Sequence, residues 1–180
     1  MPVPARRHDR SDRQTALITG SARGLGKAIA LRYATRGANI VVNYAANREA
    51  ADTTAAEIER LGVKAFSPQG DMSKVADIEQ LFTPALDQFG QIDIAVANAG
   101  IELISVPFVE ITEDQFDRQL AINTKGTSFT LQAAARHVVD NGLIIYISSS
   151  TAALPFAGEV LCGACRRRAG LSPRQRPKSR

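Results

Sequence analysis

A glycine-rich stretch near the amino terminus has the spacing of a phosphate-binding loop. Thr19–Gly26 reads TGSARGLG and follows a short apolar run. Gly20 permits a tight strand-to-helix turn, Gly24 lets the backbone approach a diphosphate, and Gly26 lets the next helix pack closely on a sheet. The N–H groups at the start of that helix, and its dipole, attract anions. The stretch predicts a dinucleotide site in which Ser21 and Leu25 also take part.

The residues that follow the second apolar run bear on the choice of nucleotide. A carboxylate at this place would hold a ribose 2′-hydroxyl and repel a 2′-phosphate. The chain has Asn43, Tyr44 and Ala45 here, with no acid, while Arg23 in the glycine loop could pair with a phosphate. We therefore expect NADP(H) in preference to NAD(H), with Arg23 and Asn43 among the binding residues. The alternative is that Arg23 is only a solvated surface charge.

A second stretch with possible chemistry is CGACR, residues 162–166. Two cysteines at C-x-x-C spacing at a helix start can form a redox pair with a lowered thiol pKa, or contribute to a zinc site. Zinc needs about four ligands. The chain has only two Cys, and His8 and His137 are remote in sequence, so we expect no metal.

Alternating elements must position these residues. Continuous apolar runs of the kind that suits strands buried on both faces occur at 15–20, 39–43, 92–98 and 143–148. Between them, residues at helical spacing form apolar faces: Leu25, Ile29 and Tyr33; Ala51, Ala55 and Ile58; Ile78, Phe82, Ala85 and Phe89. The alternation predicts an α/β fold with a doubly wound parallel sheet in three α/β/α layers.

Residues at the ends of the helical stretches agree with this pattern. Gly37, Gly62 and Gly90 each follow a helical stretch and precede a strand, where a left-handed cap suits glycine. Thr112 and Gln115 have the spacing of a capping box at the start of a later helix.

Composition limits the other classes of function. Residues 160–180 carry seven of the 22 Lys and Arg and no acid, which leaves 15 bases against 18 acids elsewhere. A nucleic-acid role would therefore rest on the tail alone, and we expect none.

No apolar run approaches the roughly 20 residues that a bilayer requires, and no secretory signal is visible, so a cytoplasmic location is expected. We expect a mobile arm at 1–13, one domain at 14–166 and a basic tail at 167–180.

Further motifs in the same order give the chain a family resemblance. GDMSK (70–74), ANAG (97–100), INTKG (122–126) and ISSS (147–150) follow the glycine loop. With them the chain resembles the short-chain dehydrogenase/reductase family, and most of all its 3-oxoacyl-carrier-protein reductase type. The resemblance implies a Rossmann-type fold that binds NAD(P). It also implies adenine contacts at Asp71 and Met72, and a cofactor border at Asn98, Ala99 and Gly100.

The resemblance implies two further roles. Asn123 matches an asparagine that bends a helix and holds a water of a proton relay, and Ser149 matches a serine that binds the substrate carbonyl. On the residues alone, Asn123 reads as a helix-terminal residue, and Ser148 or Ser150 fits the serine role as well. The family also has a Tyr followed four places later by a Lys, and Cys162 and Arg166 occupy those positions here. On this interpretation the C-x-x-C spacing arises by chance from the replacement of the family's Tyr-x-x-x-Lys motif, and it does not form a redox pair or a zinc site.

These departures leave three hypotheses for function. The first is an NADP-dependent oxidoreductase acting on a small carbonyl or secondary alcohol, impaired because a thiol at Cys162 does not reach as far as a phenol. The second is an inactive dinucleotide-binding protein. The third is an interaction protein that uses its basic tail. Residues after Gly158 lack the apolar pattern of further strands, so the fold is expected without its C-terminal strands. Family members usually form homo-oligomers, but without these strands we do not expect a homo-oligomer here. A frameshift or truncation near 158–168 is the expected origin.

Overall fold

Five parallel strands form one sheet in the structure, a computed structural model that describes residues 13–103 and 106–152. The spatial order is β3-β2-β1-β4-β5, so the chain crosses from one half of the sheet to the other between β3 and β4. The strands are β1 (Thr15–Ile18), β2 (Asn39–Val42), β3 (Ala65–Phe66), β4 (Ile92–Ala97) and β5 (Val138–Tyr146). This order confirms the predicted doubly wound α/β fold and places its switch point between β1 and β4.

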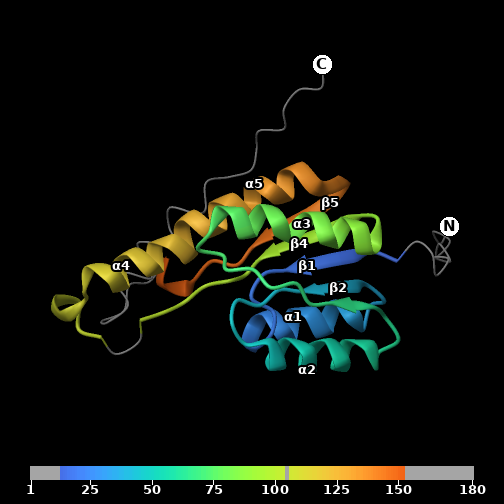
Figure 1. The fold of residues 1–180 in the computed structure, drawn as a ribbon, viewed down its shortest axis with the longest axis horizontal. Helices are drawn as coiled ribbons and strands as arrows, with labels where there is room; N and C mark the ends of the chain where they lie inside the picture. Colours follow the sequence, from blue (N-terminus) through green and yellow to red (C-terminus); the bar gives the residue numbers. More distant parts are fainter. Residues whose placement is uncertain (1–12, 104–105, 153–180) are drawn as a thin grey trace, which may run out of the picture.

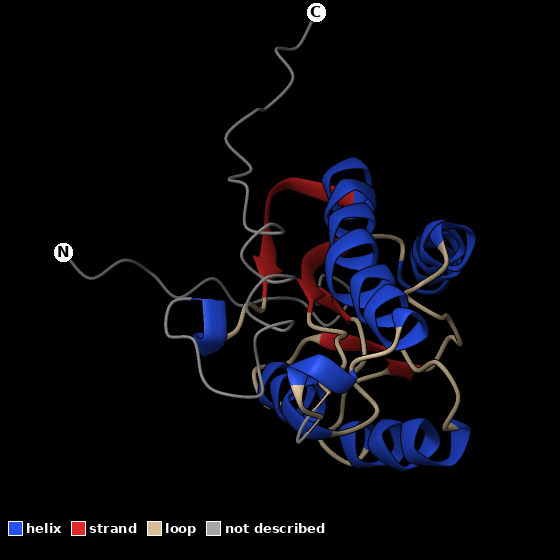
Figure 2. Cartoon of the chain, turned by 90° about the vertical axis from the view of Figure 1, so that its left-hand side faces the viewer, coloured by secondary structure: helices blue, strands red, loops and turns tan. Residues whose placement is uncertain are grey.

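Helices cover both faces of the sheet. α1 (Gly24–Ala34) and α2 (Arg48–Glu59) lie on one face, and α3 (Val75–Phe89) and α5 (Thr127–His137) lie on the other (Figure 1). α4 (Glu113–Leu120) is joined to α5 by a π-helical segment (Ala121–Gly126), and together they extend beyond the sheet. The view along the molecule shows the strands between the two groups of helices (Figure 2). Short 3₁₀ turns occur at Phe108–Glu110 and Ser150–Ala152.

The sheet has a hydrophobic core on each face, because successive side chains of a strand point to opposite faces. Ala16 and Ile18 of β1 pack with the α1 and α2 side, whereas Leu17 packs with the α3 and α5 side. Every residue of β1 and β4 is buried. The continuous apolar runs in the sequence therefore do correspond to strands covered on both faces.

The predicted helix ends are confirmed. Gly37, Gly62 and Gly90 have φ of 92°, 82° and 80°, the left-handed conformation that favours glycine. Thr112 accepts a hydrogen bond from the Gln115 N–H, and the Gln115 side chain accepts one from the Thr112 N–H, which completes the capping box.

Three features differ from the sequence-based expectation. β3 was not predicted, and β5 begins at Val138, five residues before the expected Leu143. The buried face of α1 consists of Gly26, Ala30 and Ala34, while Leu25 is 59% exposed. Small residues let α1 approach the sheet closely, so its larger apolar side chains lie at the periphery.

β5 is one of the two edge strands of the sheet within the described part of the chain, and β3 is the other. Leu143, on this strand, is 55% exposed. None of the helices within the described ranges is both long enough and apolar enough to cross a membrane.

Candidate active site

A cavity of about 560 Å³ lies at the carboxyl ends of the strands, where the fold places its switch point. Eleven of the twelve residues predicted from sequence to bind cofactor line it, and Ser21 is the exception. Its lining comprises Gly20, Ala22–Gly26, Asn43–Asn47, Ala50, Gly70–Met72, Asn98–Ile101, Ile122 and Ile147. Segments far apart in the sequence thus meet in one site. The sequence analysis places Tyr44 and Ala45 near the nucleotide, but it did not predict a role for Ala22, Ala46, Asn47, Ala50, Gly70, Ile101, Ile122 or Ile147.

The glycines of the loop have distinct geometries. Gly20 has φ of 64°, and a Cβ on it would lie 3.0 Å from Ala99 Cα. A Cβ on Gly26 would lie 2.5 Å from the Gly20 carbonyl oxygen, so this glycine allows the start of α1 to lie against the turn. Gly24 has φ of 58°, and apart from its own residue, its chain neighbours and the nearby backbone of α1, no protein atom lies within 4 Å of the place where its Cβ would be. Open space over Gly24, at the lining of the cavity, is what a bound diphosphate requires.

Thr19 and Asn98 fasten the loop to the end of β4. The Thr19 hydroxyl oxygen accepts hydrogen bonds from the N–H groups of Asn98 and Ala99, both at 3.0 Å. The Asn98 side chain in turn donates to the carbonyl oxygens of Thr19 (2.9 Å) and Gly20 (3.3 Å). The Asn98 amide therefore holds the border of the cavity, consistent with the supporting role expected of this turn.

Asn43 lines the cavity, and its side-chain amide is bonded to protein backbone. Its side chain is buried, and its Oδ1 accepts from the Gly20 N–H at 3.0 Å while its Nδ2 donates to the Gly70 carbonyl at 3.1 Å. The Asn43 carbonyl also accepts from the Ser21 N–H. With both amide atoms engaged by protein, Asn43 joins three loops beneath the cavity and shapes the site rather than offering its side chain to a ligand.

Ser21 does not line the cavity. Its side chain is buried, and its hydroxyl donates to the Ile18 carbonyl at 2.7 Å. The prediction that Ser21 contacts cofactor is therefore not supported by the geometry, because the side chain turns back toward the strand. The neighbouring Ala22 lines the cavity in its place.

The segment after β2 presents no carboxylate to the cavity. Tyr44 is buried, and Ala45, Ala46 and Asn47 are exposed along the wall. Asn47 caps α2, because its side chain accepts from the Ala50 N–H at 2.9 Å. The exposed Arg23 lies on the glycine loop, which lines the same cavity. This arrangement leaves room and positive charge for an anion, as the sequence predicts.

Asp71 and Met72 form the third wall. Burial by itself raises the pKa of Asp71, but hydrogen bonds from Ser73 and the positive charges of Lys74 and Arg118 outweigh it, so the pKa lies below its ordinary value. Met72 borders the cavity, but it is buried and belongs to the core on the α3 and α5 side. Its expected contact with adenine is therefore limited to the part of the residue at the cavity surface.

Asn123 lies within the π-helical segment rather than at a helix end. Its Oδ1 accepts from the Ile101 N–H at 2.9 Å, and its Nδ2 donates to the Ile101 carbonyl at 2.8 Å. The side chain is fully buried and Asn123 does not line the cavity, whereas its neighbour Ile122 and its partner Ile101 do. The amide atoms thus position the loop that borders the cavity, and a π segment is a frequent feature of functional sites.

Ser149 follows β5 at the carboxyl edge of the sheet. Its hydroxyl lies 2.8 Å from the Thr151 hydroxyl and accepts from the Thr151 N–H at 3.3 Å. Ser149 is not among the residues that line the cavity. Cys162 and Arg166, together with the expected tail and almost all of the expected arm, lie outside the described residues. Within the described ranges, no group of His, Cys, Asp or Glu side chains could hold a metal ion.

Comparison with protein families matches residues 14–166 to short chain dehydrogenase. The chain belongs to the short-chain dehydrogenase family. This confirms the resemblance drawn from the glycine loop and the later motifs. The 3-oxoacyl-carrier-protein reductase type within the family stays a prediction.

Several relatives within the family are reductases. The tetrahydroxynaphthalene reductase PfmaG of Pestalotiopsis fici is 42% identical over 139 residues, which cover 77% of this chain and 50% of the relative. The versicolorin reductase stcU of Emericella nidulans is 42% identical over 146 residues, covering 81% and 54%. The chain thus spans about half the length of these curated relatives.

Solved structures of the family share the fold. A short chain dehydrogenase from Burkholderia cenocepacia in complex with NADP superposes with a TM-score of 0.83 at 34% identity, covering 89% of this chain and 65% of that one. The landomycin C-6 ketoreductase LanV, with bound NADP and rabelomycin, gives a TM-score of 0.80 at 33% identity, covering 87% and 63%.

Proposed function

We propose that the cavity binds NADP(H). The observation that carries this proposal is the combination of open space over Gly24, an exposed Arg23 and the absence of a carboxylate on the Tyr44–Asn47 wall. A dinucleotide diphosphate fits the start of α1, whose N–H groups and dipole favour negative charge. The structures of family members with bound NADP support the same choice.

Each wall then has a binding task. The Arg23 guanidinium would neutralise the 2′-phosphate, and Asn47, the cap of α2, lines the same cavity. The Asp71 carboxylate, which accepts from the Ser73 N–H and lines the cavity, would accept hydrogen bonds from the nucleotide. Asn43 and Asn98 hold the loops at their separation.

Titration of the full chain with NADPH and NADH tests the binding proposal. The expected result is tighter binding of NADPH, and Arg23→Ala is expected to weaken NADPH binding about tenfold while leaving NADH nearly unchanged. Arg32→Ala is the matched control, because Arg32 is an exposed arginine on α1 outside this cavity. Equal affinity for the two nucleotides in the parent chain would contradict the proposal.

For the whole protein we propose an oxidoreductase that transfers hydride between the nicotinamide and a small carbonyl or secondary alcohol. When bound, the nucleotide supplies or accepts the hydride. Ser149 is proposed to donate a hydrogen bond to the substrate oxygen, and Asn123 to hold the cavity border through Ile101. Several relatives are named as reductases of hydroxynaphthalene and versicolorin substrates, which favours a fused aromatic ketone as a test substrate beside a generic β-ketoester.

The second candidate is a dinucleotide-binding protein without turnover. Cys162 and Arg166 favour it, because they occupy the positions of the family's Tyr and Lys. NADPH consumption with both test ketones, followed by absorbance in the parent chain and in a Cys162→Tyr/Arg166→Lys variant, separates the two candidates. Turnover in the parent supports the oxidoreductase, and NADPH binding without turnover supports the second candidate.

A further inference from the structure

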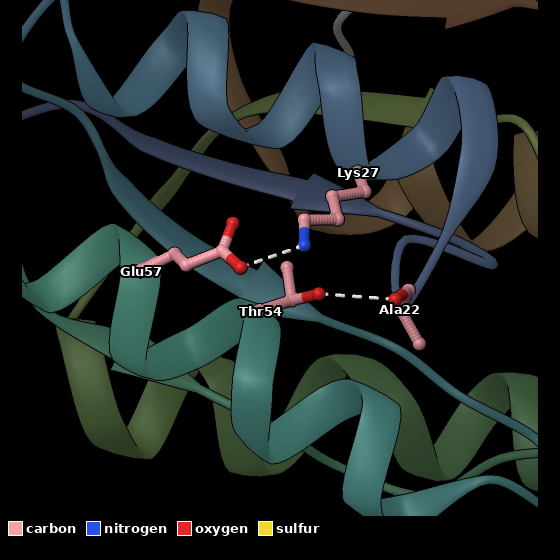
Figure 3. A network of polar contacts seen from close by, with 4 residues as sticks. All are labelled: Ala22, Lys27, Thr54 and Glu57. Carbon is pink, nitrogen blue, oxygen red and sulfur yellow. Dashed lines mark hydrogen bonds and ion pairs between the residues drawn. The ribbon is translucent and has the colours of Figure 1, made fainter.

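A threonine of α2 contacts the glycine loop from outside the cavity. Thr54 is 0% exposed, and its hydroxyl donates to the Ala22 carbonyl oxygen at 3.0 Å (Figure 3). Thr54 shares the buried face of α2 with Ala51 and Ile58, so a hydroxyl here would be costly without a partner. The hydrogen bond joins two segments that are 32 residues apart in the sequence.

The partner of this hydroxyl is unusual for a helical threonine. Threonine within a helix commonly donates to the carbonyl four residues earlier in its own helix. Thr54 donates instead to Ala22, which directly precedes the helix cap Arg23. A carbonyl before the cap has no partner within the helix, so the contact from α2 fixes its direction.

Fixing this carbonyl also fixes the Arg23 amide. The peptide between Ala22 and Arg23 is planar and trans, so the Arg23 N–H points opposite to the carbonyl that Thr54 holds. Among the described residues, the Arg23 N–H has no hydrogen-bond partner. Thr54 therefore sets the orientation of the backbone from which the Arg23 side chain extends.

A second contact lies one turn further along both helices. Lys27 Nζ of α1 and Glu57 Oε1 of α2 are 2.9 Å apart, with 28% and 33% of their side chains exposed (Figure 3). One wall of the cavity is formed at the start of α2, by Ala45, Ala46, Asn47 and Ala50, and Ala22 and Arg23 of the glycine loop form a second wall. The two contacts hold these walls at a defined separation.

We infer that Thr54 is a positioning residue for 2′-phosphate selectivity, acting through the Ala22–Arg23 peptide. This inference rests on the proposed binding of NADP(H). A 2′-phosphate held by Arg23 would depend on how the Ala22–Arg23 peptide is oriented and on the separation of the two walls, whereas the diphosphate would depend mainly on the start of α1. Loss of the Thr54 hydroxyl therefore weakens NADPH more than NADH.

The test compares NADPH and NADH dissociation constants for the full chain and four variants. Thr54→Val keeps the shape and β-branching, and Thr54→Ala introduces a strong helix former in case the valine variant does not fold. Both are expected to weaken NADPH binding about 3- to 10-fold, the worth of one hydrogen bond, and to change NADH binding less than about twofold. Thr54→Ser retains the hydroxyl and is expected to restore NADPH affinity. Thr53→Val is the matched control, since Thr53 is exposed on the same helix.

The outcomes separate the inference from the proposed function. A parent chain that fails to bind NADPH refutes the proposed function whatever the variants do. A parent that binds NADPH, with Val and Ala variants that bind it equally well, overturns the inference alone. Equal losses for both nucleotides, or a serine variant as weak as the valine variant, also overturn it, because either result indicates general loosening rather than positioning.

Discussion

The substitution Gly126→Ala tests how closely the π-helical segment lies against the loop that carries Met72. A Cβ on Gly126 would overlap the Met72 carbonyl oxygen and lie 3.0 Å from the carbonyl carbon. Both are backbone atoms, so rotation of a side chain cannot relieve the overlap. The Gly126 φ of −59° is ordinary for a helix, and the backbone conformation itself therefore does not oppose alanine.

Two opposing effects decide the magnitude. Replacing glycine by alanine within a helix stabilises it by about 1 kcal/mol when nothing else changes. Overpacking of a close contact costs about 1 to 3 kcal/mol, and an overlap with backbone belongs at the upper end of that range. The expected net change is a loss of about 2 kcal/mol in the free energy of unfolding. Helix propensity alone predicts the opposite sign.

Urea unfolding of the full chain, followed by circular dichroism, measures this change. Ser128→Ala is the control, because Ser128 is exposed two residues further along and its loss is expected to change stability by less than about 0.5 kcal/mol. A Gly126→Ala chain as stable as the parent would refute the reasoning, since it would show that the helix and the Met72 loop separate without cost.

Three further predictions concern the residues around the cavity. Asn43→Ala is expected to lower the free energy of unfolding by about 1 to 3 kcal/mol, because it leaves the Gly20 N–H and the Gly70 carbonyl unpaired; urea unfolding measures it. Thr19→Val is expected to cost a similar amount of about 1 to 3 kcal/mol, since the hydroxyl oxygen accepts from two N–H groups; thermal unfolding at a fixed pH checks it. Because the pKa of Asp71 is lower in the folded chain, its carboxylate contributes stability that is fully present when the pH is above the ordinary pKa of about 3.9. This contribution is lost as the pH falls through the lower folded pKa, so Asp71→Asn is expected to flatten the acid side of a stability-against-pH profile.

Much of the fold could be predicted because its strands are covered on both faces. A strand such as β1 must then be apolar throughout, and glycines at 37, 62 and 90 must end the helices in a conformation other residues avoid. β3 could not be predicted, because it has only two residues, and a strand this short depends on pairing with β2 rather than on its own sequence.

The start of β5 was missed for a different reason. Asp140, Asn141 and Gly142 are typical of a turn, yet they lie within the strand. Asn141 has φ of 67°, and the register with β4 shifts between Ile92 and Ile94, so this part of the strand is irregular. A pattern based on residue types describes regular strands and misplaces irregular ones.

With the exception of Ser21, the residues predicted to bind cofactor lie together around one cavity, and the structure shows where each side chain turns. The order of the motifs identifies the loops at the carboxyl ends of the strands, and most of these residues do surround the cavity. Sequence spacing does not show which way a side chain turns, so Ser21 and Asn43 were predicted as ligand contacts although both bond to backbone. Asn47 had a detectable signal, since an asparagine three residues before the alanine-rich face of α2 is a typical helix cap.

The asparagines of the site explain this difference physically. At the carboxyl ends of β1 and β4 the chain leaves the sheet, and backbone groups there lose the partners that a strand would supply. An asparagine amide carries both a donor and an acceptor, so it can replace a peptide group in such a gap. Asn43, Asn98 and Asn123 each bond to main-chain atoms of a different loop. Because these amides are engaged by protein, the proposed selectivity for the nucleotide would depend on backbone N–H groups and on the exposed Arg23. The residues that hold that backbone would then matter to binding as much as those that face the cavity.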